Sequence, residues 1–380
     1  MNNRDKKKKI LIVGRSFYPM NSPRAFRTTE LVKEFARQGH DVTLLTLKNS
    51  AVHPDFEKEH GVTIKDLGSL TLPGIDFKGT NRIAVLFKRA LRRGLYQFFE
   101  YPSIELMWKT KRALEKESGY DLLITIAAPH PVHWGTAWAW KNGNKVAETW
   151  VADCGDPYMG SRLDTFNKLF YFKYFEKAFC RKADFITVPI EGAKEGYYPE
   201  FREKIEVIPQ GFRFDDVEIR KNGKPGNNVP TFAYAGGLIP GGRDPRAFLE
   251  YLLSLQTEYH CIFYTKSRNM VAPYAERADG KIEIRDYIPR KELLNTLSGM
   301  DFLLNFENDT SLQLPSKLID YYLTGRPVLS VKSGEAPTET LHQFLKGNYS
   351  ARYPFEDMDQ YRIENVCYRF LSLHHNLHEP

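Results

Sequence analysis

The sequence has 380 residues, and its 54 Lys and Arg against 47 Asp and Glu give a formal charge of +7 at neutral pH. This length suggests about two domains of roughly 100 to 200 residues each, and a hydrophobic content of 42% excludes a disordered chain. No apolar run approaches the roughly 20 residues that a membrane-spanning helix needs. The basic N-terminus lacks a cleavage signal, and the four cysteines lack zinc or disulfide spacing, so we expect a cytoplasmic protein.

A first β-α-β unit is predicted within residues 9–46. Two short apolar runs, 9–14 and 42–46, are typical of strands buried in a parallel sheet, and apolar residues at helical spacing predict a helix over 28–38 between them. The loop 14–27 lacks the glycines of a dinucleotide fingerprint, which disfavours a nicotinamide cofactor. Arg24 and Arg27, near the predicted helix start, suit an anion, although a solvated helix end is the alternative.

The same alternation of predicted strands and helices continues along the chain. Further strands are predicted at 121–126, 149–153, 185–189 and 205–209, and a polar segment with Gly and Pro follows at 213–230. A second series of strands is predicted at 231–237, 261–265, 282–284, 301–305 and 327–331. We therefore predict a first α/β domain over 1–212, a linker over 213–230, a second α/β domain over 231–357, and a C-terminal helix over 358–380 that packs back on the first domain.

The most informative segment is residues 312–329. Pro315 and Ser316 are predicted to open a helix, whose first backbone N–H groups are free to bind an anion. Lys317 adds a positive charge at that turn, and Asp320 lies one turn further along. An amide cradle with a lysine suits a phosphate, and a neighbouring carboxylate suits ribose hydroxyls. The alternative is an ordinary amphipathic helix.

The run P-S-K-L-x-D-Y-x-x-x-G-R-P-V at 315–328 resembles the donor-site helix of retaining GT-B glycosyltransferases of family 4, which build bacterial surface polysaccharides. Other segments are similar to the family in the same order along the chain, so that the resemblance covers about residues 9–330. These segments are 22–27 with 39–42, 129–135, 151–157, 204–211, and 234–237 with 243–244.

The resemblance implies a GT-B fold of two doubly wound, Rossmann-like α/β domains facing a cleft. It also implies metal-independent transfer, with no cofactor, from a UDP- or GDP-linked nucleotide sugar to a glycan or polyprenyl-linked acceptor. Arg243 and Lys317 are expected on the donor diphosphate, where positive charge stabilises the departing group, and Asp320 on the ribose. The transferred sugar is expected near His133, with His130 as the rival. The remaining predicted site residues are Gly236, Gly237, Pro315 and Ser316 for the donor, and Arg24, Arg27, His130 and Asp156 for the acceptor or its loops.

Two positions depart from the family pattern. Leu312 stands where a glutamate is expected, and Gly237 stands where an arginine is expected. Glu307 and Asp309 are candidates to replace the lost contact with the donor sugar. These departures keep two alternatives open, a non-catalytic nucleotide-sugar or glycan-binding protein on the same fold, and a sugar-nucleotide epimerase.

Two further patterns suggest metal ligands. Asp357 and Asp359 form a DxD sequence, which we interpret as a solvated loop because no buried strand precedes it. His374 and His378 lie one helical turn apart, but a frayed C-terminal helix is the preferred interpretation. We therefore expect no metal site.

Residues 82–93 form a basic amphipathic stretch. Its cations Arg82, Lys88, Arg89, Arg92 and Arg93 are accompanied by no acidic residue, and its apolar residues share one helical face. Such a helix suits peripheral contact with an anionic membrane. The alternative is that the apolar face packs on the first domain and the charges are solvated. Nucleic acid is not expected, because no recognition motif accompanies the charge.

Overall fold

The computed structural model describes residues 6–74, 82–140, 146–160, 168–215, 226–307 and 316–378. The chain divides into two compact units. Unit 1 comprises Met1–Phe212 and Gln360–Pro380, and unit 2 comprises Arg213–Asp359.

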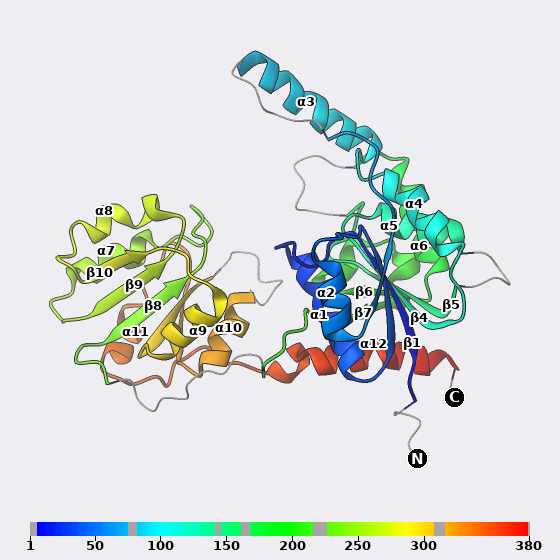
Figure 1. Cartoon of the computed structure of the whole chain (residues 1–380). Coiled ribbons are helices and arrows are strands. Elements are labelled where there is room, and N and C mark those ends of the chain that lie inside the picture. The colour runs from blue at the N-terminus through cyan, green and yellow to red at the C-terminus, as the bar shows by residue number, and fades with distance from the viewer. Residues whose placement is uncertain are drawn as a thin grey trace. The chain divides into compact units, whose positions relative to one another are not determined.

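Unit 1 is built on a seven-stranded parallel sheet in the order β3-β2-β1-β4-β5-β6-β7 (Figure 1). The central strands are apolar along nearly their whole length and are buried on both faces, as a parallel sheet with helices on both sides requires. The strands are β1 (Lys9–Gly14), β2 (Asp41–Thr46), β3 (Thr63–Asp66), β4 (Tyr120–Ile126), β5 (Ala147–Asp153), β6 (Phe185–Val188) and β7 (Ile205–Val207).

Two apolar layers cover this sheet. On one face α1 and α12 pack with β1 and β2, and on the other face α4, α5 and α6 pack with β4 and β5. The last helix of the chain, α12, thus contributes to the core of unit 1. The helices are α1 (Pro23–Arg37), α2 (His53–His60), α3 (Arg82–Phe99), α4 (Glu105–Leu114), α5 (Pro131–Ala139), α6 (Phe172–Lys182) and α12 (Ile363–His378), with the 3-10 turns η2 (Glu191–Gly196) and η3 (Pro199–Lys204).

The helix α1 begins five residues before its predicted start at residue 28. Ser22 has an extended backbone and its Oγ accepts a hydrogen bond from Ala25 N, while Pro23 occupies the first helical position. Arg24 and Arg27 therefore lie within the first turns of the helix, a placement that the apolar spacing alone did not predict.

Unit 2 is a smaller version of the same architecture, with a five-stranded parallel sheet in the order β10-β9-β8-β11-β12. Stacked aromatic rings such as Phe232 and Phe302, whose centroids are 4.4 Å apart, fill its core. The strands are β8 (Thr231–Ala235), β9 (His260–Tyr264), β10 (Ile282–Arg285), β11 (Phe302–Phe306) and β12 (Val328–Val331). The helices are α7 (Arg246–Ser254), α8 (Ala272–Ala275), α9 (Arg290–Ser298), α10 (Ser316–Thr324) and α11 (Thr338–Leu345), with η4 (Arg268–Met270) and η5 (Met358–Tyr361).

The strand order of each unit changes direction beside its first strand, between β1 and β4 in unit 1 and between β8 and β11 in unit 2. Loops at the carboxyl ends of such strands diverge and leave a crevice, which is where doubly wound sheets bind ligands. The predicted class of two Rossmann-like α/β domains is confirmed, and the topology locates one candidate crevice in each unit.

One helix of unit 1 departs from the layered arrangement. The helix α3 extends away from the sheet (Figure 1). Among the described helices, none is both long enough and apolar enough to span a membrane.

Candidate functional site

Unit 2 contains a pocket of about 350 Å³ at the carboxyl ends of β8 and β9, beside α9 and α10. The predicted residues Gly236, Gly237, Lys317 and Asp320 all line it. Its other walls are mainly apolar and aromatic, a combination that suits a flat ring held among a few polar groups. The remaining lining residues are Ala235, Tyr264, Thr265, Lys266, Tyr287, Ile288, Leu293, Leu297 and Tyr321.

Lys317 lies in the first turn of α10 with its ammonium group held inside the pocket wall. Its Nζ lies 4.7 Å from the centroid of the Tyr234 ring and 3.4 Å from the carbonyl oxygen of Phe306. Burial, together with the nearby positive charge of Arg243, lowers the pKa of Lys317 to about 7. Within the described part of the chain, no carboxylate forms an ion pair with this ammonium group.

Arg243 lies in the loop between β8 and α7, close to Lys317. Its Nε is buried and has no hydrogen-bond partner among the described residues. The loop is closed by Asp244, which accepts hydrogen bonds from the backbone N–H groups of Gly241 and Arg246. Two cations that no described acidic residue neutralises thus lie in one small region, an arrangement that favours a bound anion.

The loop after β8 approaches its neighbours closely at Gly236. Its φ of 148° lies in a region that favours glycine, and a Cβ there would lie 3.1 Å from Tyr234 Oη. Tyr234 Oη in turn donates a hydrogen bond to the carbonyl oxygen of Gly237, 2.8 Å away. These contacts fix the loop at the entrance of the pocket.

Asp320 lies one turn beyond Lys317 on α10. Its Oδ1 accepts two hydrogen bonds from Arg290, the shorter at 2.6 Å from Nη2. Burial raises the pKa of Asp320, and Arg290 opposes this shift. Both contacts use the same carboxylate oxygen, so Oδ2 is left for another donor within the described structure.

The remaining residues discussed for the donor site lie partly inside and partly outside the described structure. Pro315, Leu312 and Asp309 lie outside the described residues. Ser316 is the first residue of α10, and Glu307 directly follows β11.

Unit 1 contains a second pocket, of about 530 Å³, at the carboxyl ends of β1, β4 and β5. The predicted residues His130 and Asp156 line it, while His133, Arg24 and Arg27 do not. The remaining lining residues are Arg15, Ser16, Met20, Tyr96, Glu100, Ser103, Ala128, Pro129, Pro157, Tyr158 and Lys168.

The two histidines of the loop after β4 have different environments. His133 is fully buried, with Nδ1 2.8 Å from Thr125 Oγ1 and Nε2 3.3 Å from Cys154 Sγ. Burial lowers its pKa to about 3. Both ring nitrogens are therefore occupied in the core, and this geometry argues against the predicted contact between His133 and a sugar.

His130, the rival candidate, is better placed. Its Nε2 is buried without a hydrogen-bond partner among the described residues, and the side chain lines the pocket of unit 1. Burial, with the neighbouring His133, lowers its pKa well below the usual value, so the ring is neutral at physiological pH. A neutral imidazole with one free nitrogen can exchange a hydrogen bond with a hydroxyl group.

Arg27 and Asp153 form a buried ion pair. The guanidinium group makes two hydrogen bonds to the carboxylate, of 2.6 and 2.9 Å, and also donates to the carbonyl oxygens of Ile208 and Pro209. These four bonds commit Arg27 to the junction of α1, β5 and the segment after β7. Its role is structural, and the prediction that it contacts an acceptor is not supported by this placement.

Arg24 lies at the edge of the same network. Its Nη1 is 3.6 Å from Asp153 Oδ2, and its guanidinium group packs against Gly155, where any Cβ would clash with it. Burial lowers the pKa of Arg24, and Asp153 opposes this shift. Arg24 thus also contributes to the ion-pair network around Asp153, and its side chain remains 22% exposed.

The pocket of unit 1 also contains a polar cluster that was not predicted from the sequence. Glu100 accepts hydrogen bonds from Tyr158 Oη at 2.7 Å and from Lys168 Nζ at 3.1 Å. The Lys168 ammonium also lies over the rings of Tyr96 and Tyr158, at 4.1 and 4.6 Å. These residues come from three distant segments without a shared motif, so no local signal indicated them.

In unit 2, by contrast, Tyr264 lies at the end of the predicted strand 261–265, and Lys266 and Tyr287 closely follow the predicted strands 261–265 and 282–284. Their position at strand ends was a usable signal for pocket residues.

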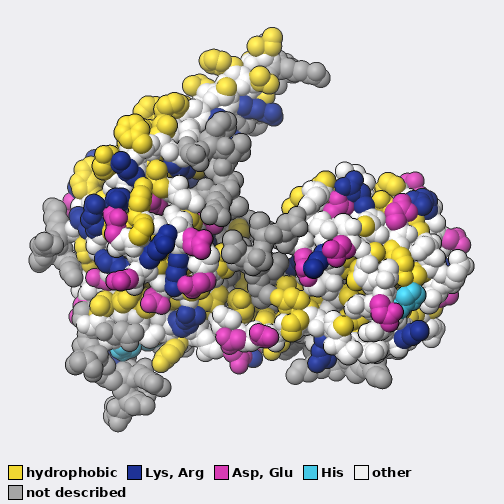
Figure 2. All heavy atoms as spheres, turned by 180° about the vertical axis from the view of Figure 1, so that it is seen from behind, with side chains coloured by type: hydrophobic (Ala, Val, Ile, Leu, Met, Phe, Trp, Pro, Cys, Tyr) yellow, Lys and Arg dark blue, Asp and Glu magenta, His cyan; other side chains and the backbone are white. Residues whose placement is uncertain are grey.

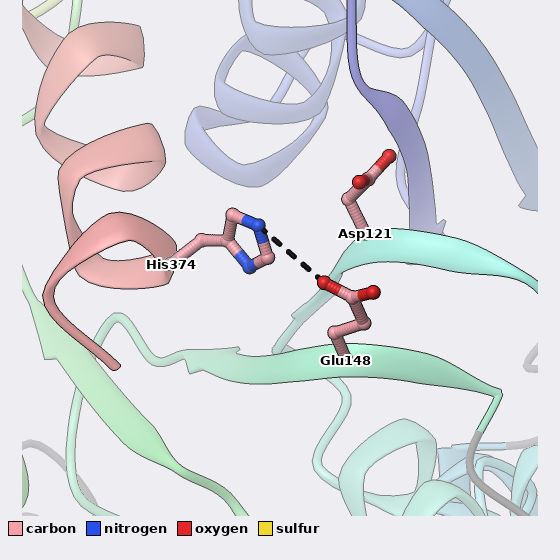
Figure 3. A group of neighbouring side chains, drawn as sticks. All are labelled: Asp121, Glu148 and His374. Carbon is pink, nitrogen blue, oxygen red and sulfur yellow. Dashed lines mark ion pairs between the residues drawn. The ribbon is translucent and has the colours of Figure 1, made fainter. Parts of the chain in front are cut away.

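One group of potential metal ligands exists among the described residues, formed by Asp121, Glu148 and His374 (Figure 3). It lies at the amino ends of β4 and β5, at the opposite edge of the sheet from the crevice of unit 1. Lys8 Nζ lies 3.1 Å from His374 Nε2 and 3.8 Å from Asp121 Oδ1, so an ammonium group already occupies the space beside two of the three residues. The group therefore does not indicate a metal centre.

The same contacts correct one prediction about the C-terminus. His374 is buried and its Nδ1 lies 2.9 Å from Thr149 Oγ1, so α12 is not frayed at this residue. The side chain of His378 lies outside the described residues. Asp357 and Asp359 are exposed, in agreement with a solvated loop.

Several solved structures share this fold. A glycosyltransferase from Rickettsia africae aligns over 99% of this chain and all of its own, with 13% identity and a TM-score of 0.60. Anabaena HepE, solved with UDP and glucose, aligns over 98% of both chains with 12% identity and a TM-score of 0.52. A Listeria monocytogenes protein assigned as a UDP-N-acetylglucosamine 2-epimerase aligns over 99% of this chain and 98% of its own, with 13% identity and a TM-score of 0.53.

Because the sequence identities are only 12–13%, these similarities are evidence for the fold alone. They agree with a two-domain GT-B fold. A comparison with curated proteins gave no match. The sequence comparison with family models is more specific, because the model of Glycosyltransferase Family 4 matches residues 26–215, half of the chain. With the fold and the family model in agreement, the chain belongs to glycosyltransferase family 4.

Proposed function

We propose that this protein transfers a sugar from a nucleoside-diphosphate sugar bound in unit 2 to a glycan or lipid-linked saccharide. The observation that carries the proposal is the pair of cations Arg243 and Lys317 beside a mainly apolar pocket. A diphosphate would supply the missing negative charge, and the pocket between Tyr264, Tyr287 and Leu293 would take the flat base. Asp320 Oδ2 would accept a hydrogen bond from the ribose.

The chemistry proposed for these residues is charge stabilisation. The bond between the anomeric carbon and the diphosphate oxygen breaks, and the diphosphate leaves with the electron pair. The acceptor oxygen bonds to the anomeric carbon and gives its proton to an oxygen of the departing diphosphate. Arg243 and Lys317 would hold the charge that grows on the diphosphate. We further propose retention of configuration and a role in surface polysaccharide synthesis, a proposal supported by the resemblance of residues 315–328 to the family's donor helix.

His130 is proposed to orient a sugar hydroxyl. Its lowered pKa makes it a weak base, so a hydrogen bond suits it better than proton removal. The pocket of unit 1, with His130 and Asp156, is the proposed place of the acceptor.

The test is a screen of UDP-, GDP-, CDP- and dTDP-sugars by thermal shift, followed by nucleotide release with and without saccharide acceptors. A ligand at a concentration of 100 times its Kd stabilises the folded protein by roughly 2.7 kcal/mol. The nucleotide sugar that raises the melting temperature is thereby identified as the donor. Lys317→Ala and Arg243→Ala should each lose this shift and lower turnover, whereas Lys346→Ala, on an exposed surface of unit 2, should not.

The two alternatives predict different results in the same screen. A binding protein would show the thermal shift without any release of nucleotide. An epimerase would convert the free nucleotide sugar without an acceptor. The epimerase is disfavoured because Asp320 is the only carboxylate that lines the pocket within the described residues, and it is paired with Arg290.

A further inference from the structure

The helix α3 of unit 1 leaves several large apolar side chains uncovered by the described fold. It is 18 residues long, and its apolar residues recur at positions 83, 86, 87, 90, 91 and 98, which places them on one side of the helix. Leu86 and Phe87 are 70% and 69% exposed, and Phe98 is 52% exposed. The alternative, that this face packs on the first domain, is therefore wrong for these residues.

Positive charge accompanies this apolar face. Lys88, Arg89, Arg92 and Arg93 lie on the remaining circumference of the helix, and no Asp or Glu occurs between Arg82 and Phe99. Figure 2 shows hydrophobic side chains along the projecting helix with Lys and Arg beside them. An apolar face flanked by cations alone matches the boundary between acyl chains and anionic head groups.

We propose that α3 is an interfacial docking helix that lies in the plane of an anionic lipid bilayer. Its apolar side chains enter the acyl boundary, and its cations contact the head groups. A second copy of this chain is a less suitable occupant, because pairing two such helices would bring cations against cations with no carboxylate on either helix to neutralise them.

The position of the helix links docking to the pocket of unit 1. Tyr96, in the last turn of α3, and Glu100, directly after it, both line that pocket. Lys168 bridges the two, because it contacts the Tyr96 ring and pairs with Glu100. Docking would thus bring the pocket to the membrane surface, where a lipid-linked acceptor is presented. This second step rests on the proposed function, whereas docking itself does not.

The test is sedimentation of the full-length protein with vesicles of phosphatidylcholine alone or mixed with phosphatidylglycerol. We expect binding to the anionic vesicles that weakens as salt is raised, and little binding to the neutral ones. The variant Leu86→Ser/Phe87→Ser should bind the anionic vesicles at least about tenfold more weakly. The reason is that burial of each of these side chains raises the binding constant by more than about tenfold. The variant Lys88→Glu/Arg89→Glu should lose binding to a similar extent.

The matched control is Trp138→Ser/Leu377→Ser, which removes two apolar side chains that are 54% and 48% exposed outside α3. It should bind as the unchanged protein does. The proposal is overturned by equal binding to both vesicle types, by equal losses in the control and in the α3 variants, or by a dimer that Leu86→Ser/Phe87→Ser converts to a monomer without any vesicle binding.

Nucleotide-sugar turnover with a water-soluble acceptor, measured without vesicles, separates the two proposals. If the α3 variants lose vesicle binding but keep full turnover, the proposed function is unaffected. Vesicle binding without turnover would leave docking standing and refute the proposed function.

Discussion

The carboxyl edges of the two sheets hold similar residue types in opposite electrostatic states. In unit 1, Arg27 is paired with Asp153 and Lys168 with Glu100, and the two histidines are neutral. In unit 2, Lys317 and Arg243 lie together without a neutralising carboxylate in the described structure. The fold itself balances the charges of these two pairs in unit 1, whereas the proposed diphosphate would balance the two cations of unit 2.

This difference separates structural charge from charge reserved for function. A buried pair such as Arg27 with Asp153 leaves an uncompensated charge when one partner is removed. A buried cation without a partner instead reduces the stability of the free protein and binds an anion tightly.

The largest effect is expected at the balanced edge. Arg27→Met leaves Asp153 buried without its partner and should lower the free energy of unfolding by about 3–5 kcal/mol. Lys194→Met is the control in the same unit, because Lys194 pairs with Glu191, whose side chain is 75% exposed, and it should cost less than about 1 kcal/mol. Urea unfolding measures both, and equal losses would contradict a structural role for Arg27.

At the unbalanced edge, removing a cation should have the opposite effect on stability. The pKa of Lys317 is lowered from 10.5 to about 7 in the folded protein, so the unfolded chain binds more protons between these values. The free energy of unfolding therefore rises as the pH increases from about 7 to about 10.5. The buried charge of Lys317 lowers it most below pH 7. Lys317→Met should raise the melting temperature at pH 6 and leave it unchanged near pH 11.

The same variant should weaken nucleotide-sugar binding by about 1.5–3 kcal/mol, the usual contribution of a hydrogen bond to a charged group. Isothermal titration calorimetry measures the loss. A stabilised variant that binds the donor as well as the unchanged protein does would remove Lys317 from the donor site.

The dependence of donor binding on pH is the next effect in size. Because Lys317 titrates near pH 7, affinity for a nucleotide sugar should fall by up to about tenfold from pH 6 to pH 8. A nucleotide sugar is preferable to a free nucleotide, whose terminal phosphate itself titrates near pH 6. Lys317→Met should abolish the dependence, and its persistence would assign it to another group.

The smallest effect is expected for the histidine of the acceptor pocket. His130→Ala should lower transfer by about tenfold or less, the contribution of one hydrogen bond, with little loss of stability. His133→Ala should instead lower stability, because it removes a core side chain that contacts Thr125 and Cys154. Initial rates and urea unfolding of both variants check this, and the reverse pattern would restore His133 as the site residue.

Local sequence patterns predicted much of the fold and part of the site. Short apolar runs that ended at polar loops predicted strands such as β1 and β5, and thereby the edge where ligands bind. The first residues of α10 were predicted to carry Lys317 and Asp320 because helix start and charge are both local features. The start of α1 was missed, because Ser22 and Pro23 set it by capping rather than by apolar spacing.

Local sequence was thus sufficient to predict the alternation of strands and helices, the two sheets, and the types of residue at their carboxyl edges, because each depends on neighbours along the chain. Which charges are balanced depends on tertiary contacts between distant residues. Asp153 lies 126 residues from Arg27, and Glu100 lies 68 from Lys168. Tertiary packing also determines that His133 is in the core while His130 lines a pocket, and that α3 is exposed, because burial depends on what the rest of the chain packs against each face.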